Sequence, residues 1–534
     1  MQKLLNCLCV LLLLGCARAQ SRSCESLGQL ELPQATITSA ETIAAGALPV
    51  PANLPPVMGD LAPLFKSLPA FCRVTVRSKP SADSDIKIEV WMPAAGWNGR
   101  FRGQGNGGFA GLIAPNVLAT ALRQGYATAG TDTGHSASGI DARWALGHPE
   151  KVTDFGYRGI HEMTQIAKAV IAAFYGSKAR YSYFGACSNG GRQALMEAQR
   201  FPEDYDGILA GAPANFWTHL LADGVWNAQV TAKDAASYIP SSKLPAIAAA
   251  VNAKCDAQDG VADGILNDPR QCRFDAAAML CTNGDSDQCL TAPQVTALNQ
   301  LYEGAHDKSG QIFPGFVPGA EEGPGGWSLW ITGAAPGKAL LFAFANGFFS
   351  NMVYEKPDWD FRSANLTEAT RVADSKAAST LNAVNPNLEP FRARGGKLIL
   401  YHGWNDPAIP ALNTIDYYSS VVKQMGKQNT DSFLRLYMVP GMQHCGDGPG
   451  TDSFGQHGDH ASQDPQHNVL LALENWVEKN DAPSKIIATK YGSGPQSSEM
   501  KMTRPLCPYP GSARYNGNGD PNKAESFSCS AAGK

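Results

Sequence analysis

The sequence predicts an α/β protein in which one large inserted domain interrupts a mostly parallel sheet. Between residues 126 and 214, short apolar strands alternate with helical segments, as they do where crossover helices join parallel strands. From about 215 to 390 this alternation stops, and Gly- and Pro-rich loops with many Trp and Phe residues follow before an apolar strand returns at 397–403. We therefore expect a core domain in two parts, 20–214 and 391–534, with a lid domain at 215–390.

The composition is that of a globular, loop-rich protein without a strong charge. Of 534 residues, 44% are hydrophobic, so the chain can bury a large core. The formal net charge is −4 and the isoelectric point is near 6.2, which leaves no basic field to attract nucleic acid or an anionic membrane. We expect no nucleic acid partner and no membrane span.

The first residues predict an export signal, assigned to 1–19. MQKLLNCLCVLLLLGCARAQ has one lysine, an apolar run too short to span a bilayer, and Ala17-Arg18-Ala19, which suits cleavage before Gln20. Leu13-Leu14-Gly15-Cys16 also resembles a bacterial lipoprotein processing site, which would leave Cys16 lipid-anchored. We favour a secreted or periplasmic protein over an anchored one.

The cysteine content agrees with export. Of 13 cysteines, Cys7, Cys9 and Cys16 lie in the leader, which leaves ten in the mature chain. An even number in an exported chain predicts a disulfide framework. No spacing matches the paired C-x-x-C of a zinc site, and these spacings leave the pairing open.

Residues 86–111 predict a strand, a turn at Asn98-Gly99, a second strand and a glycine-rich loop. Gly105, Gly107 and Gly108 do not have the G-x-G-x-x-G spacing of a phosphate-binding loop. Backbone N–H groups without side chains can instead point at the oxyanion of a tetrahedral intermediate. A plain glycine-rich hairpin is the alternative.

Residues 181–192, YSYFGACSNGGR, predict a strand, a tight turn and the start of a helix. The helix continues through QALMEAQRF, which is rich in helix-favouring residues. Ser188 lies on the turn with Gly190 two residues later, which is the layout of the nucleophile elbow of an α/β-hydrolase. Because Ala186 replaces the first glycine of the usual G-x-S-x-G, an ordinary strand-to-helix turn is the alternative.

An acidic loop inside the expected lid predicts a calcium site. The segment CDAQDGVADGILNDPRQC (255–272) places Asp256, Asp259, Asp263 and Asp268 among glycine turns. Carboxylates and inward-facing carbonyl groups form the oxygen cage that Ca²⁺ prefers, although the spacing is not that of an EF-hand. A solvated acidic turn is the alternative.

Three candidate catalytic residues each follow a predicted strand, in the order Ser188, Asp406 and His444. The strand KLILYHG (397–403) precedes Asp406, and FLRLYMVPGM (433–442) precedes His444. This is the chain order of the α/β-hydrolase triad. His444 would take the proton of Ser188 and return it to the leaving alcohol, while Asp406 would hold the imidazole tautomer.

Two expectations follow from this triad. The backbone N–H groups of Gly108 and Asn189 are the predicted oxyanion hole. Cys187 precedes the nucleophile and Cys445 follows the histidine, so these two cysteines must lie close in space if the triad forms. A bridge between them would tie the elbow to the histidine loop.

Five motifs together resemble the tannase and feruloyl esterase family, which also contains the bacterial hydrolase of mono(2-hydroxyethyl) terephthalate. They are the C-S-x-G-G-R elbow, PGMQHC, YHGWND, CDAQDGVADGI and the tail TRPLCPYPGSARY…FSC. The resemblance covers nearly all of the mature chain. It implies an α/β-hydrolase fold with a lid, and the triad Ser188, Asp406 and His444.

The resemblance also implies a metal site and a disulfide pattern. Ca²⁺ would be held by the side chains of Asp256, Asp259 and Asp263 and by the carbonyl oxygens of Val261 and Ile265. The implied disulfides are Cys187–Cys445, Cys24–Cys72, Cys255–Cys272, Cys281–Cys289 and Cys507–Cys529.

Substrate choice is expected to lie in the lid. By the same resemblance, Trp330, Phe344 and Phe348 follow or end the WSLW segment and would grip the aromatic acid, with Ile409 facing them from the aspartate loop. The alternative for each aromatic residue is the core of the lid.

One departure from the terephthalate-monoester hydrolase is informative. That enzyme holds the free carboxylate of its substrate with a lid arginine, whereas no arginine occurs here between Arg273 and Arg362, and Phe344 stands at about the matching position. Lys338 would be a mobile point charge rather than a bidentate grip. We expect weak or no activity on terephthalate monoesters and favour neutral acyl groups such as ferulate, p-coumarate, caffeate or gallate.

The sequence thus predicts a secreted serine carboxylesterase acting on small aromatic esters of phenolic acids, derived from plant cell walls or polyphenols. Alternatives are tannase or terephthalate-monoester activity, or a non-catalytic polyphenol- or glycan-binding protein that kept the fold. The filled triad positions argue against the non-catalytic alternative.

Overall fold

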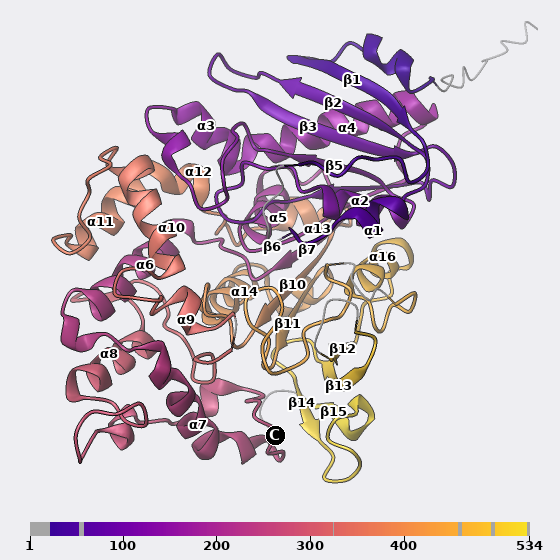
Figure 1. Cartoon of the computed structure of the whole chain (residues 1–534). Helices are drawn as coiled ribbons and strands as arrows, with labels where there is room; N and C mark the ends of the chain where they lie inside the picture. The colour runs from indigo at the N-terminus through magenta and orange to yellow at the C-terminus, as the bar shows by residue number, and fades with distance from the viewer. Residues whose placement is uncertain (1–21, 53–57, 324, 458–461, 493–496, 531–534) are drawn as a thin grey trace, which may run out of the picture.

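The computed structural model describes residues 22–52, 58–323, 325–457, 462–492 and 497–530 (Figure 1). The predicted signal peptide and the alternative anchor at Cys16 lie outside these residues. Within them, no helix combines the length and apolar character needed to cross a bilayer.

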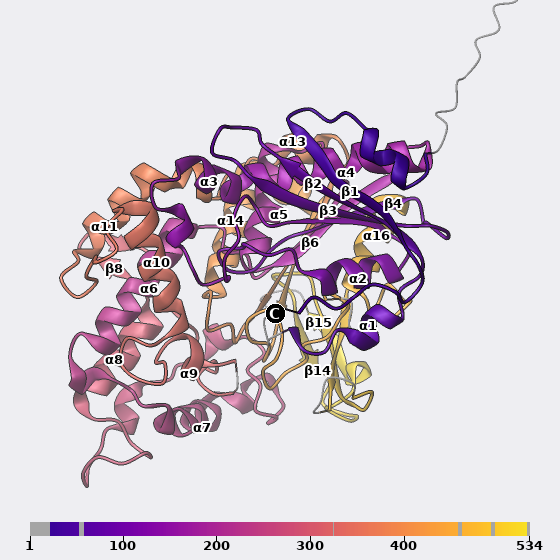
Figure 2. The same cartoon turned by 45° about the horizontal axis from the view of Figure 1, so that its top comes forward.

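A nine-stranded sheet runs through the molecule in the order β1-β2-β3-β5-β4-β6-β7-β10-β11 (Figure 1, Figure 2). From β5 to β11 neighbouring strands are parallel, whereas β1, β2, β3 and β5 pair antiparallel in succession. The strands are β1 (Ala35–Ile43), β2 (Phe71–Ser78), β3 (Ile86–Pro93), β4 (Arg100–Gln104), β5 (Ala127–Thr131), β6 (Tyr181–Cys187), β7 (Gly207–Gly211), β10 (Lys397–Gly403) and β11 (Leu434–Val439).

The parallel strands lie where the alternation of strand and helix predicts them, but the antiparallel edge was not predicted. β1 has no fully buried residue, because it lies at the edge of the sheet and half of its side chains face solvent. A polar edge strand of this kind carries too few apolar residues to stand out in the sequence.

Helices cover both faces of the sheet. One face packs against α4 (Gly159–Tyr175), α5 (Asn189–Arg200) and α14 (Leu412–Met425), and the other against α2 (Pro115–Arg123) and α16 (Val469–Lys479). The central strands are therefore covered on both sides, and every residue of β5 and β7 is buried. This explains why these strands are continuously apolar or small rather than alternating.

The chain between β7 and β10 leaves the sheet and forms the lid, which gathers at one side of it (Figure 1). Its main elements are α6 (Trp217–Ala232), α7 (Leu244–Cys255), α8 (Ala292–Glu303), β8 (His306–Asp307), β9 (Gly310–Gln311), α9 (Trp327–Trp330), α10 (Leu340–Phe348), α11 (Leu366–Ala373) and α12 (Ser379–Leu381).

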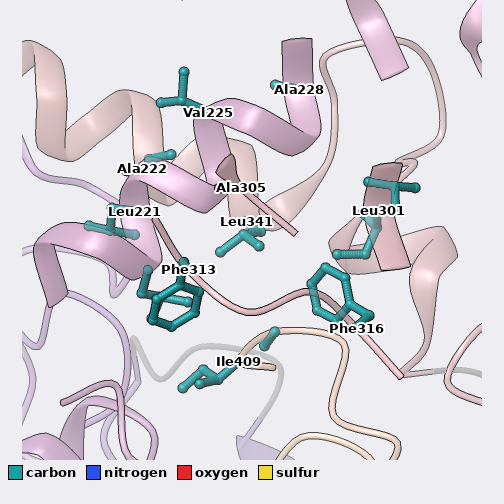
Figure 3. Close-up of a cluster of buried hydrophobic side chains, with 14 of the residues drawn as sticks. Leu221, Ala222, Val225, Ala228, Leu301, Ala305, Phe313, Phe316, Leu341 and Ile409 are labelled. Atoms are coloured by element: carbon teal, nitrogen blue, oxygen red, sulfur yellow. The ribbon is translucent and has the colours of Figure 1, made fainter. Parts of the chain in front are cut away.

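The lid has its own hydrophobic core. Leu221 and Val225 of α6 belong to one cluster of buried side chains with Leu341 of α10 and Phe313 of the loop before α9 (Figure 3). Ile409, from the loop after β10, belongs to the same cluster (Figure 3). The lid core therefore continues onto the loop that carries Asp406.

The remaining elements complete the core domain. Two small hairpins close the C-terminal part of the chain and pair antiparallel. These elements are α1 (Ala62–Lys66), α3 (Pro149–Thr153), α13 (Glu389–Ala393), α15 (Lys427–Asp431), β12 (Ile486–Tyr491), β13 (Met500–Leu506), β14 (Ser512–Tyr515) and β15 (Phe527–Ser530).

Among the described residues, five disulfides join the ten cysteines in the pairs that the family resemblance implied. The pairs are Cys24–Cys72, Cys187–Cys445, Cys255–Cys272, Cys281–Cys289 and Cys507–Cys529. A mostly parallel sheet covered by helices on both faces, with the lid inserted after β7, is the predicted α/β-hydrolase fold.

Candidate active site

Ser188 lies on a strained turn between β6 and α5. Its backbone has φ 66° and ψ −126°, in a region that non-glycine residues rarely adopt. Both of its backbone groups are held: its N–H donates to Gly211 O (3.0 Å), and its carbonyl oxygen accepts from Ala214 N (3.1 Å). The strain lifts the hydroxyl above the C-terminal ends of the parallel strands, as expected for a nucleophile elbow.

Two glycines accommodate Ala186, the departure from G-x-S-x-G. A Cβ on Gly190 would lie 2.4 Å from the Cβ of Ala186, and a Cβ on Gly105 would lie 2.7 Å from it. Both distances are far below van der Waals contact. Ala186 therefore fits the elbow because Gly190 and Gly105 leave room for its methyl group.

The three predicted catalytic side chains lie within hydrogen-bonding distance of one another. The Ser188 hydroxyl donates to His444 Nε2 at 3.0 Å, and His444 Nδ1–H donates to Asp406 Oδ2 at 2.8 Å. The Asp406 side chain is fully buried, whereas 13% of the His444 side chain is exposed. This is the arrangement in which a histidine can take the serine proton while a carboxylate fixes its tautomer.

Asp406 is held as a carboxylate in a buried position. Its Oδ1 accepts hydrogen bonds from the N–H groups of Ala408 (2.8 Å) and Ile409 (2.9 Å). Burial by itself would raise the pKa of Asp406, but the charge of His444 and hydrogen bonds from His402 and His444 outweigh burial and hold that pKa well below its usual range. The group is ionised at every pH at which an esterase works.

A second histidine contacts this carboxylate. His402 Nε2 lies 3.2 Å from Asp406 Oδ2 and 3.0 Å from Ile409 O, and its Nδ1 lies 2.7 Å from Thr414 Oγ1. The sequence analysis did not single out His402. The available signal was a fully buried polar residue at the end of an otherwise apolar strand, four positions before Asp406.

The disulfide between Cys187 and Cys445 ties the nucleophile to the histidine. It joins residues 258 apart in sequence, with a Cα–Cα distance of 6.0 Å. His457 Nε2 lies 2.6 Å from the carbonyl oxygen of Cys445 and supports the same loop. Cys187 and Cys445 are therefore close in space, as the triad requires.

Gly108 and Asn189 face the same cavity as Ser188. Asn189 is the first residue of α5, where an N–H has no partner within the helix. Among the described residues, neither amide donates to another group. Gly108 has φ +54°, and a Cβ there would lie 2.2 Å from Gly139 O, so only glycine fits. The two N–H groups are available to an oxyanion.

A cavity of about 370 Å³ opens over the serine. Its apolar walls come from the lid and the aspartate loop, and no Lys or Arg is among the described residues that line it. The lining residues are Gly107, Gly108, Cys187, Ser188, Asn189, Ala214, Trp217, Leu220, Leu221, Trp330, Leu341, Phe344, Ala408, Ile409, His444, Cys445 and His457. We call this space the catalytic cavity.

Three of the four predicted substrate-binding residues line the catalytic cavity. Trp330 and Phe344 stack at 6.2 Å between ring centroids, and Trp330 also meets His444 edge-on at 5.1 Å. Ile409 faces them from the aspartate loop. Phe348 does not line this cavity: it lies one turn further along α10 than Phe344, and its side chain is fully buried and packs on Phe349 in the lid core.

The sequence analysis missed the contribution of α6 to this cavity. Trp217, Leu220 and Leu221 lie on one face of α6, at helical spacing, and line the catalytic cavity. Their position directly after β7 was a usable signal, because residues beyond the C-terminal ends of parallel strands build such sites.

The acidic loop at 255–272 folds around its own carboxylates. Asp256 accepts from the N–H groups of residues 263 (3.2 Å) and 264 (2.9 Å), and Asp259 from those of residues 261 (3.0 Å) and 267 (3.3 Å). Burial, with the charges of Asp263 and Asp256, raises the pKa of Asp259 to about 6. Asp263 also pairs with Arg504. Among the described residues, the carbonyl oxygens of Val261 and Ile265 accept no hydrogen bond.

Comparison with known proteins gives a consistent result. Residues 72–530 match the family described as tannase and feruloyl esterase. An uncharacterized esterase of Xanthomonas campestris pv. campestris is 43% identical over 95% of this chain and 91% of its own length. Feruloyl esterase B of Aspergillus niger is 32% identical, covering 96% of each chain. The crystal structure of feruloyl esterase B from Aspergillus oryzae superposes with a TM-score of 0.86 at 30% identity, covering 95% of this chain and 99% of the other.

Proposed function

Because this chain belongs to the tannase and feruloyl esterase family, we propose that it hydrolyses carboxylic esters of phenolic acids with Ser188 as the nucleophile. The observation that carries the proposal is the hydrogen-bonded chain from Ser188 through His444 to Asp406 at the floor of an apolar cavity. A non-catalytic binding protein would have no use for this arrangement.

The reaction follows from the geometry. His444 Nε2 takes the proton as Ser188 Oγ attacks the ester carbonyl, and the N–H groups of Gly108 and Asn189 stabilise the oxyanion. His444 then returns the proton to the leaving alcohol, and water attacks the acyl-enzyme by the same route in reverse. Asp406 stays ionised throughout and stabilises the imidazolium. The edge-on ring of Trp330 limits the movement of His444.

The catalytic cavity favours a neutral aromatic acyl group. Trp330, Phe344 and Leu341 form an apolar wall of the cavity. No cationic side chain among the described lining residues would pair with a second carboxylate on the acyl group of a substrate. A terephthalate monoester would bury its free carboxylate there without a partner, at a cost of several kcal/mol. Feruloyl, p-coumaroyl and caffeoyl are the best-matched acyl groups.

The test is hydrolysis of methyl ferulate, methyl gallate and the terephthalate monoester by the wild type and by Ser188→Ala. We expect turnover of the phenolic esters by the wild type only, with a loss of roughly 10³-fold or more in the variant. Equal rates in the two proteins would refute the serine-esterase proposal. Faster cleavage of the gallate than of the ferulate would favour tannase activity.

We further propose that the acidic loop binds Ca²⁺. The set of three carboxylates with two free carbonyl oxygens suits a hard cation, and Asp256, Asp259 and Asp263 repel one another without one. In the described structure the three carboxylates do not all approach within 4.8 Å, so binding would draw the loop inward. Chelation should lower the thermal midpoint and release one metal ion per chain. An unchanged midpoint and metal content would contradict the assignment.

Finally, we propose that the protein is exported. Five disulfides are typical of an oxidising compartment. Fractionation of cells that express the full chain, with mass determination of the mature N-terminus, would distinguish cleavage before Gln20 from lipid attachment at Cys16. A product that keeps Met1 in the cytoplasm would refute export.

A further inference from the structure

Arg192 ends the elbow motif C-S-x-G-G-R and takes no part in the proton transfers of the triad. It lies near the start of α5, three residues after Asn189, and it is fully buried. A cation at this end of a helix is repelled by the positive end of the helix macrodipole, and burial removes its hydration. Both effects are unfavourable in the folded protein, so a compensating anion is expected nearby.

The hydrogen bonds of the Arg192 guanidinium all go to neutral groups. Nε donates to Asn189 Oδ1 at 2.9 Å, and Nη2 donates to Phe155 O at 3.1 Å. Nη1 donates to Gly156 O at 2.8 Å and to Leu381 O at 3.3 Å. These dipoles replace part of the lost hydration, but none of them carries a negative charge.

No described residue supplies an anion for Arg192. The guanidinium forms no ion pair within the described part of the chain, and the charge that acts on it is that of Arg200, another cation. Burial, together with this charge, lowers the pKa of Arg192 to about 9, so the group stays charged at neutral pH. The two other arginines that the described structure buries, Arg102 and Arg504, are each stabilised by the charge of an acidic side chain.

The charge of Arg192 lies directly behind the wall of the catalytic cavity. Arg192 does not line the cavity, but it contacts two residues that do: Nε bonds to the Asn189 side chain, and the Trp217 ring centroid lies 5.0 Å from Cζ. One layer of side chains therefore separates the guanidinium from the cavity. Because solvent does not reach this layer, the charge is screened much less than a surface charge.

We propose that Arg192 is a positioning residue of the oxyanion hole, and that its buried charge stabilises the negative charge that forms beside Asn189 during the reaction. This inference rests on the proposed function. As Ser188 Oγ attacks, the carbonyl oxygen of the ester becomes negative next to the Asn189 N–H. The intact ester carries no such charge, so Arg192 stabilises the transition state more than the bound substrate. Arg192 keeps its protons throughout.

A purely structural role is the competing explanation. The same guanidinium joins the start of α5 to residues 155 and 156 before α4 and to the end of α12. If Arg192 served only to join these segments, its loss would lower the thermal midpoint, and kcat would fall only with the unfolded fraction. An electrostatic role predicts a loss of kcat in protein that is still folded.

The first test measures kcat and KM for methyl ferulate in Arg192→Met, Arg192→Lys and the control Arg200→Met, each below its thermal midpoint. We expect kcat to fall about tenfold or more in Arg192→Met with KM changed less than about twofold, because only the transition state carries the charge. Arg192→Lys keeps the charge and should recover most of this loss. A folded Arg192→Met with wild-type kcat, or equal losses in the lysine and methionine variants, would overturn the proposal.

Arg200→Met is a matched control on the same helix. Arg200 lies at the exposed end of α5 and donates to the carbonyl oxygen of Ser379 in the lid. Its replacement removes the same charge and a similar contact far from Asn189, so kcat should stay near the wild-type value. A loss of kcat equal to that of Arg192→Met would overturn the proposal. Arg192→Gln is measured alongside, because it is neutral yet can still donate to a carbonyl oxygen if the methionine variant does not fold.

The second test uses an aryl trifluoromethyl ketone, which forms a tetrahedral oxyanion with Ser188, and its alcohol analogue, which forms no adduct. We expect the neutral variant to bind the ketone about tenfold or more weakly than the wild type, and the alcohol equally well. A structural defect of the cavity would weaken both ligands by the same factor. Equal losses for the two ligands would therefore overturn the proposal.

Methyl ferulate also separates this inference from the function on which it rests. If the wild type does not cleave methyl ferulate, the proposed function fails together with the role of Arg192. If the wild type cleaves it and the folded neutral variant keeps the wild-type kcat, the esterase activity holds and only the role of Arg192 is refuted.

Discussion

Asp223 should make the lid less stable as pH rises toward 8. The residue is fully buried in α6, and its Oδ2 accepts from Asn227 Nδ2 at 3.0 Å. Its Oδ1 and the Asn227 Oδ1 both lack a partner, which suits a protonated acid able to donate. Burial, opposed by the hydrogen bonds of Asn227 and Ala305, raises the pKa of Asp223 to about 8.

The sign follows from proton binding in the two states. In the unfolded chain an aspartate has a pKa of about 3.9, so between about pH 4 and pH 8 the folded state binds one proton more than the unfolded state. Stability therefore falls by about 1.4 kcal/mol per pH unit across this window, to a loss on the order of 4 kcal/mol at pH 7. Below pH 4 both states are protonated and the loss vanishes.

The perturbation is Asp223→Asn, which keeps the shape and stays neutral at every pH. Between pH 5 and pH 7 its advantage over the wild type should grow by about 3 kcal/mol, or roughly 5–10 °C in the thermal midpoint if the lid unfolds as one unit. The assay is differential scanning calorimetry at both pH values, with the exposed lid residue Asp358→Asn as control. An advantage that is equal at pH 5 and pH 7, or a variant less stable at pH 7, would refute the reasoning.

Three further predictions concern the active site. His402→Asn should lower kcat about tenfold or more, yet leave the acidic limb of the pH–rate profile in place, because His444 also holds the pKa of Asp406 low; a limb moved by a full pH unit would contradict this. The double variant Cys187→Gly with Cys445→Ala should lose more kcat than the unfolded fraction at the assay temperature accounts for. The thermal midpoint, measured on the same samples, gives that unfolded fraction. Loss of the midpoint with kcat retained would make this bridge merely structural. Phe344→Arg should raise kcat/KM for the terephthalate monoester relative to methyl ferulate by about tenfold, since it supplies a bidentate partner for the carboxylate; an unchanged ratio would show that the acyl group does not reach α10.

The triad was predictable because each of its members follows a buried parallel strand. Apolar runs such as KLILYHG can be found in the sequence, and the residue after each run must lie at the same edge of the sheet. The adjacency of Cys187 to Ser188 and of Cys445 to the histidine added a constraint across 258 residues. Both signals can be found in the sequence alone, and both require Ser188, Asp406 and His444 to lie close together.

No such rule places the substrate-binding residues of the lid. Phe344 and Phe348 lie on the same short helix four residues apart, yet the first lines the catalytic cavity and the second is fully buried in the lid core. All residues of α10 except Asn346 are apolar or glycine, so hydrophobic periodicity does not show which part of the helix meets substrate. Which turn of α10 meets the cavity is set by how α10 packs on α6, and that contact is made by residues more than one hundred positions apart.

Ala186 shows why a motif is a weaker guide than the space around it. The alanine departs from the usual elbow, but Gly105 and Gly190 remove the two Cβ atoms that would collide with it, so the turn keeps its shape. Gly105 is 81 positions away in sequence from the alanine that it accommodates. The missing side chains of Gly105, which follows β4, and of Gly190 in α5 thus let the nucleophile turn form with an alanine at position 186.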